Sequence, residues 1–252
     1  MNEQQEVSLN LGNIQTQWSM IRDAHRSKAT LNSAAYARET LVMRYASAIR
    51  NFVKVVVRDD HLVDEIAQDA LVRLLKGDFS GADPNRGRFR DLLKTAIRNM
   101  VKNHWAKENR RASVDFDLDQ IDNAEPNSED EFWAAQWTET VLSIAWQRLK
   151  ALEDSSESIA HTVLKLRSTY PDDSSTQLAE RLSESVGKPY TAATTRQQLR
   201  RARVRFAEYL VSEIADGLTD PTPENLADEL KSLGLYKSVQ DVLPKEWQTN
   251  SQ

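Results

Sequence analysis

Apolar residues recur at three- and four-residue spacing through most of this chain, whereas the strict alternation of a half-buried strand is scarce. Only 7 glycines interrupt 252 residues, and residues that favour helices surround the apolar positions. This pattern predicts an all-α protein. A chain of this length can form one large domain or two small ones.

Charge is distributed unevenly, although the net charge is only -5. Residues 86–111 are strongly basic and contain only two acidic residues, Asp91 and Glu108. Residues 115–131 are strongly acidic and contain no Lys or Arg. Adjacent segments of opposite sign indicate binding partners, because a charge pattern of this kind does not follow from folding alone.

The acidic segment also carries Pro126, Asn127 and Ser128 and offers little to bury, so it is typical of a linker. Thr222, Pro223 and Gly234 are placed as the start and stop of a short helix near the end of the chain. The predicted organisation is a disordered tail (1–15), a first helical domain (16–111), an acidic linker (112–135), a second helical domain (136–215) and a C-terminal helical extension without an assigned role (216–252).

Two predicted helices in the first domain each have an apolar stripe and a charged face. The first follows Asp59 and Asp60 as capping residues, and its charged face carries Asp64, Glu65, Gln68 and Asp69. The second begins near Phe89, and its basic residues four apart predict a cationic ridge of Arg90, Lys94, Arg98 and Lys102.

Asn99, Asn103, His104 and Trp105 lie beside this ridge, with Lys107 one turn further on. Amides that can reach base edges, rings that can stack and cations that can bind phosphate are the combination that single-stranded nucleic acid requires. The alternative for the ridge is an ordinary solvated helix face, and Trp105 is equally compatible with a place in the core.

The second domain contains the pattern of a helix-turn-helix. Ser174 to Gln177 fits a capping box that opens a short helix closed by Gly187, and Thr194 to Gln197 fits a second one. The helix after the second box should point basic and amide side chains outward, toward a DNA major groove. These side chains are Arg196, Gln197, Arg200, Arg201 and Arg203.

Motifs for catalysis or cofactor binding are missing from the sequence. It has no cysteine, no HExxH pattern and no glycine-rich phosphate loop, and its 4 histidines are scattered. The carboxylates at 64, 65 and 69 lack the further partners of a metal or acid-base site, so partner docking is the preferred interpretation. We therefore expect no enzyme activity, cofactor or metal. No secretion signal or membrane-length apolar run is evident, so we expect a cytoplasmic protein.

The segments "DDHLVDEIAQDALVRLLKG" and "GRFRDLLKTAIRNMVKNHWAKENRR" resemble region 2 of the sigma-70 family of RNA polymerase sigma factors, in order, spacing and charge. Leu92 stands where that family usually has Trp, and the loop at 81–87 is longer. The segment "SSTQLAERLSESVGKPYTAATTRQQLRRARVRF" is similar to region 4, with an insertion at 188–191. Since no intermediate helical domain separates the two, the chain resembles the small extracytoplasmic-function (ECF) group.

This resemblance implies a factor that binds core RNA polymerase and directs promoter recognition, minus-10 melting and transcription initiation. The acidic face (Asp64, Glu65, Gln68, Asp69) would dock on the β′ coiled coil, and the second domain on the β flap. The linker would thread through the polymerase, and an anti-sigma factor is a further partner that the family allows. No membrane and no small-molecule substrate are implied.

The same resemblance assigns the DNA contacts. The melted minus-10 strand would contact Phe79, Arg90, Lys94, Arg98, Asn99, Lys102, Asn103, His104, Trp105 and Lys107, with Phe79, Asn99 and Asn103 lining a pocket for a flipped base. The minus-35 element would contact Arg196, Gln197, Arg200, Arg201 and Arg203.

Two other functions stay open from the residues alone. The first is a free-standing helix-turn-helix regulator that binds duplex DNA without polymerase. The second is a helical enzyme that acts on nucleic acid, which would need Asp64 as a metal ligand.

Overall fold

The structure is a computed structural model that describes residues 31–57, 59–76, 88–112, 126–218, 220–243 and 245–247. All regular elements in these ranges are helical, which confirms the all-α prediction. The predicted N-terminal tail, the loop that carries Phe79 and residues 113–125 of the predicted linker lie outside the described residues.

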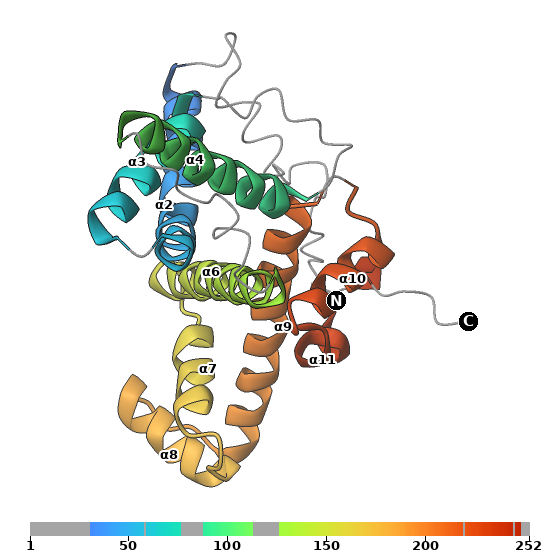
Figure 1. The fold of residues 1–252 in the computed structure, drawn as a ribbon. Helices are drawn as coiled ribbons and strands as arrows, with labels where there is room; N and C mark the ends of the chain where they lie inside the picture. Colours follow the sequence, from blue (N-terminus) through green and yellow to red (C-terminus); the bar gives the residue numbers. More distant parts are fainter. Residues whose placement is uncertain are drawn as a thin grey trace.

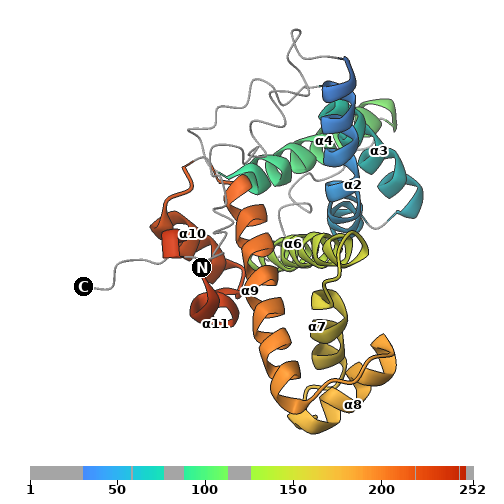
Figure 2. The ribbon, with the colours of Figure 1, turned by 180° about the vertical axis from the view of Figure 1, so that it is seen from behind.

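Helices α2, α3 and α4 gather at one end of the molecule, and the helix-turn-helix unit formed by α8 and the start of α9 lies at the other (Figures 1 and 2). A long helix, α9, runs between the two ends, and α6 crosses it near the middle (Figure 1). The helices are α2 (Leu31–Val56), α3 (Asp60–Lys76), α4 (Phe89–Ala112), α6 (Pro126–Asp154), α7 (Ala160–Thr169), α8 (Ser175–Val186), α9 (Ala192–Asp216), α10 (Pro223–Ser232) and α11 (Tyr236–Val239). The 3-10 turns η3 (Gln240–Val242) and η4 (Lys245–Trp247) follow them.

Helix α3 begins and packs as its sequence predicts. The Asp59 carboxylate accepts hydrogen bonds from the backbone N–H groups of His61 (2.9 Å) and Leu62 (3.4 Å), which satisfies donors that the first helical turn leaves open. The apolar stripe of α3 is buried against α2. Its acidic face is therefore turned to solvent.

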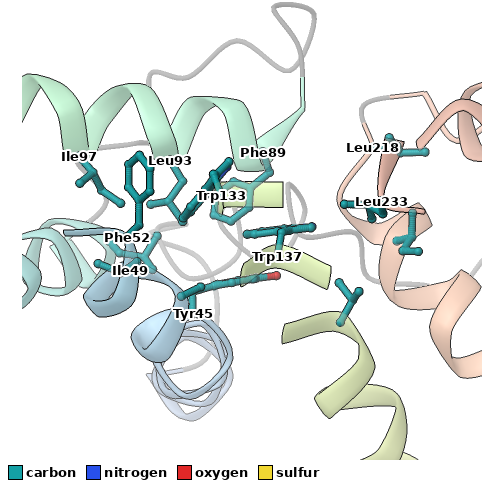
Figure 3. Close-up of a cluster of buried hydrophobic side chains, with 14 of the residues drawn as sticks. Tyr45, Ile49, Phe52, Phe89, Leu93, Ile97, Trp133, Trp137, Leu218 and Leu233 are labelled. Atoms are coloured by element: carbon teal, nitrogen blue, oxygen red, sulfur yellow. The ribbon is translucent and has the colours of Figure 1, made fainter. Parts of the chain in front are cut away.

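Helix α6 begins inside the segment predicted to be a linker. It begins at Pro126, where a missing N–H costs no helical hydrogen bond, so residues 126–135 are helix and not linker. Trp133 from this stretch and Trp137, one turn further along α6, are buried in the core of the first domain. Trp137 stacks on Tyr45 with centroids 5.1 Å apart, and Trp133 lies 4.8 Å from Phe52 (Figure 3).

One hydrophobic core joins segments that the sequence assigned to different domains. It contains side chains from α2, α3, α4, the N-terminal half of α6, the C-terminal half of α9 and the C-terminal extension. Figure 3 shows the aromatic part of this core, with Leu218 and Leu233 approaching from the extension. The second domain of the prediction is therefore divided, because its last helix ends inside the core of the first.

A second, smaller core holds the helix-turn-helix unit together, with Val163, Leu178, Leu182, Leu199 and Ala202 at its centre. The predicted capping box at Ser174 is present, and Gly187 ends α8 with a φ of 72°.

The second capping box lies three residues earlier than predicted. Helix α9 begins at Ala192, and the Thr191 hydroxyl accepts a hydrogen bond from the N–H of Thr194 (3.2 Å). Thr191 has the extended backbone of an N-cap, so Thr194 is the third helical residue and not the cap.

The C-terminal extension folds onto the main core. Thr222 caps α10, Pro223 is its first residue, and Gly234 follows the helix with a φ of 70°, as predicted. Leu226 and Leu230 are fully buried. The extension therefore contributes to the core shared by α4, α6 and α9.

A buried carboxylate links three helices. Glu213 of α9 is fully buried and lies 3.1 Å from Arg44 of α2 and 3.1 Å from Arg148 of α6. Asp216, one turn along, is also buried, and its Oδ1 has no hydrogen-bond partner among the residues that the structure describes. Burial, together with the charge of Glu213, raises the pKa of Asp216 to about 7.

We expect Asp216→Asn to stabilise the protein more at pH 8 than at pH 5, relative to the unmodified chain. The native state holds the Asp216 proton more tightly than the unfolded chain does, so the protein loses stability as pH rises from the ordinary Asp pKa of 3.8 to about 7. An amide does not titrate, so the variant avoids a cost of roughly 2–4 kcal/mol at high pH. Thermal unfolding from pH 5 to pH 8 measures this, and a melting-temperature difference that does not change with pH would contradict it.

Candidate nucleic-acid interface

The acidic face of α3 is fully available to a partner. Asp64, Glu65, Gln68 and Asp69 are all exposed. Asp64 pairs with Arg50 (2.9 Å) and Asp69 with Arg73 (3.1 Å), but these pairs lie in solvent, where an ion pair contributes about 0–1 kcal/mol. A binding partner can therefore replace them at little cost.

The C-terminal half of α4 presents amides and cations together. Asn99, Lys102, Asn103 and Lys107 are exposed, and their spacing of three and four residues places them on one side of the helix. The amides can reach base edges while the ammonium groups approach phosphates. This half of the predicted ridge keeps the composition of a nucleic-acid surface.

The N-terminal half of the ridge is placed differently from the prediction. Arg90 is 8% exposed, and its guanidinium contacts Glu229 of α10 through Nε–Oε1 (3.1 Å) and Nη2–Oε2 (3.3 Å). Arg90 Nη2 also donates to Ser232 Oγ (3.1 Å). The prediction that Arg90 points outward to DNA is therefore wrong in this conformation, because a carboxylate of the C-terminal extension holds it inside.

Two further ridge cations are engaged by the first turns of α6. Lys94 donates to Asp130, and Arg98 donates to Glu129. Arg88, just before α4, lies 2.8 Å from the Glu229 carboxylate. The cationic ridge is therefore divided into an N-terminal part that is neutralised within the chain and a C-terminal part that faces solvent.

His104 and Trp105 occupy an intermediate position. Both are half-buried, their rings meet edge to face with centroids 6.2 Å apart, and Trp105 packs against the main core. Trp105 thus has the core role that its spacing allowed, while part of its ring surface stays accessible.

The predicted DNA-reading face of α9 is exposed. Leu199 and Ala202 point into the small core, and the five predicted side chains, Arg196, Gln197, Arg200, Arg201 and Arg203, are all exposed. Gln197, Arg200 and Arg201 also line a cleft of about 750 Å³ between α9 and the loop that joins α6 to α7. Arg205 lines the same cleft, and its ion pair with Glu208 (2.8 Å) was not predicted.

Sequence reasoning missed the acidic residues that engage the ridge. Glu129 and Asp130 were assigned to a linker, and Glu229 was given no role. The adjacency of a basic and an acidic segment was a usable signal for the first two, because opposite charges close in sequence can pair within one chain. Nothing local to Glu229 indicated its partner, which lies 139 positions away.

The described ranges also bear on metal binding and on membrane insertion. Among those residues, no group of three or more His, Cys, Asp or Glu side chains is arranged to hold a metal ion. None of the helices in the described part of the chain is long and apolar enough to cross a membrane.

Comparison with known proteins identifies one segment. Residues 41–111 match the family model for Sigma-70 region 2. This segment holds α3, α4 and most of α2 and covers less than a third of the chain. No curated protein and no solved structure matches the chain.

The exposed α9 face leads to a prediction about duplex DNA. We expect Arg200→Ala and Arg201→Ala each to weaken binding to a fluorescent duplex and to lower the slope of log K against log salt by about 1, because each removes one phosphate-binding cation. Fluorescence anisotropy at several salt concentrations measures both effects. Arg73→Ala on α3 is the matched control, since it removes one exposed arginine outside this face. Equal losses in all three variants would argue against a DNA interface on α9.

Proposed function

We propose that this protein is a sigma factor of the ECF type that binds core RNA polymerase, recognises promoters and initiates transcription. The observation that carries the proposal is the combination found within the segment that matches Sigma-70 region 2. There, an exposed acidic face on α3 and an exposed amide and cation face on α4 belong to one helical bundle.

The acidic face of α3 is the docking surface in this proposal, with the β′ coiled coil of the polymerase as its partner. Its carboxylates are exposed and only weakly paired, so a basic protein surface can bind them without breaking the core. The apolar side of α3 packs on α2, so the helix presents these side chains from a rigid support.

The C-terminal half of α4 binds the melted minus-10 strand. Lys102 and Lys107 contact phosphates, Asn99 and Asn103 contact bases, and the accessible part of Trp105 offers a stacking surface. Base capture is favoured on an opened strand because a base in a duplex must first be unstacked. Phe79, the proposed third side of the base pocket, lies outside the described residues.

The helix-turn-helix unit reads the minus-35 element and contacts the β flap. Arg196, Gln197 and Arg200 lie in the first turns of α9, the part of a recognition helix that approaches base edges. Catalysis belongs to the polymerase, and the protein acts in the cytoplasm as a DNA-binding and polymerase-binding subunit. An anti-sigma factor is a further partner in this proposal.

A free-standing helix-turn-helix regulator is the second candidate. It is favoured by the separate core of α7, α8 and α9, which supports an exposed arginine face without help from α3. This function would not need the acidic face of α3. The two candidates therefore differ in whether polymerase docking is required.

We expect the double variant Asp64→Lys/Asp69→Lys to reduce run-off transcription with core polymerase by at least about tenfold. The new lysines would repel the basic polymerase surface that the acidic face of α3 is proposed to bind. Glu224→Lys/Asp228→Lys on α10 is the control, since it makes the same charge change at exposed positions away from α3. Transcription and co-purification of tagged protein with polymerase subunits are the measurements.

The proposal is wrong if the unmodified protein gives no transcription above core enzyme on promoters from its own genome. Tight operator binding by the isolated protein that is unaffected by the Asp64 and Asp69 changes would favour the free-standing regulator.

A further inference from the structure

Three carboxylates from two distant segments hold the N-terminal half of the α4 ridge. Glu129 and Asp130 come from the first turns of α6, and Glu229 comes from α10. We call these three side chains the acidic latch. Their partners are Arg98, Lys94 and Arg90, with Arg88 beside them.

The ion pairs of the acidic latch differ in how far they are exposed to solvent. The Glu229 side chain is 4% exposed and faces an Arg90 side chain that is 9% exposed, so this pair is shielded from solvent. The Asp130 side chain is 59% exposed, and it engages Lys94 at the protein surface. A competing anion can therefore replace Asp130 first and meets increasing resistance toward Glu229.

A backbone hydrogen bond and a serine side chain hold the acidic latch at a fixed position along α4. The N–H of Phe89, at the start of α4, donates to the carbonyl of Gly217 at the end of α9 (3.4 Å), where the two helix termini carry opposite partial charges. Ser232 Oγ donates to the backbone carbonyl of Glu229 (2.8 Å), lies 3.2 Å from the Glu229 carboxylate and accepts from Arg90, so it packs between the two charged side chains. Buried Leu226 and Leu230 hold α10 in place.

Carboxylates and phosphates compete for the same cations, because both bind guanidinium and ammonium groups through charged oxygens. The three latched cations continue the row that ends in the exposed half of α4. A single strand that binds Asn99 and Lys102 would next reach Arg98 and Lys94. These two cations are already paired with carboxylates of the acidic latch.

We propose that the acidic latch is an autoinhibitory contact that lowers the affinity of the free chain for single-stranded DNA. Release of Glu129, Asp130 and Glu229 exposes the full ridge of α4. This inference rests on the proposed function, since it concerns the strand-binding face of α4. It places the regulation inside the chain, in the first turns of α6 and in the C-terminal extension.

The test compares charge-matched variants for binding to a short fluorescent single-stranded oligonucleotide. The latch variant is Glu129→Gln/Asp130→Asn/Glu229→Gln. The control is Glu139→Gln/Glu224→Gln/Asp228→Asn, which removes the same charge from exposed positions of the same two helices that have no ion pair with α4 in the described structure. Asp130→Asn alone serves as a third variant, because its exposed side chain can be changed without disturbing the core.

We expect the latch variant to bind the single strand at least about tenfold more tightly than the control at low salt. Its slope of log K against log salt should rise by about 2, roughly 0.7 for each cation released. Asp130→Asn should show a smaller gain in the same direction. Binding to duplex DNA through α9 should not differ between the latch variant and the control, since no latch residue contacts that face.

Equal single-strand binding by the latch variant and the control, which remove the same charge, would overturn the latch. Equal gains for single-stranded and duplex DNA would also overturn it, because they would show a general charge effect. Run-off transcription by the unmodified protein with core polymerase tests the proposed function separately. A protein that transcribes while its latch variant gains no affinity therefore rejects only the latch.

Discussion

Two tryptophans of α6 determine how the whole molecule is assembled. Trp137 stacks on Tyr45 at an interplanar angle of 3°, and Trp133 packs on Phe52, so the start of α6 is fixed to α2. The C-terminal half of the same helix packs against α7 and α9. Losing a buried tryptophan typically costs about 3–5 kcal/mol, a large share of the stability of a domain. The bundle of α2 to α4 and the helix-turn-helix unit are therefore parts of one body in this conformation.

Burial of charge follows from that assembly. Once α6 and α9 are packed together beside α2, Glu213 has no exposed surface, and the partly exposed side chains of Arg44 and Arg148 reach in to pair with it. An unpaired carboxylate there would be strongly destabilising, so the two arginines determine which alignment of the helices is tolerated. The Arg90 and Glu229 pair has the same effect for α10. These contacts select one arrangement even where their net contribution to stability is small.

Features set by local sequence could be predicted, and features set by distant partners could not. The stripe of α3, the caps at Ser174 and Thr222 and the exposed acidic face follow from spacing of a few residues. The linker prediction extended too far because the acidic composition of the segment outweighed Trp133, which lies four residues before Trp137 and so continues the helical pattern of the second domain. Arg90 was assigned to the outside because helical periodicity carries no information about a carboxylate on α10.

The net negative charge of the chain is compatible with the proposed nucleic-acid face, because Glu129, Asp130 and Glu229 pair with cations of α4 within the fold. Salt weakens phosphate binding and exposed ion pairs alike, so it also loosens the outer part of the latch. Added salt would therefore weaken the binding of DNA phosphates. It would also release α4 cations from the acidic latch, and these cations could then bind phosphate. For single-strand binding by the free chain, the slope of log K against log salt should therefore be shallower than the number of cations on the α4 ridge predicts. Net charge alone is a poor guide here, because the pairing of charges within the fold determines which cations are available.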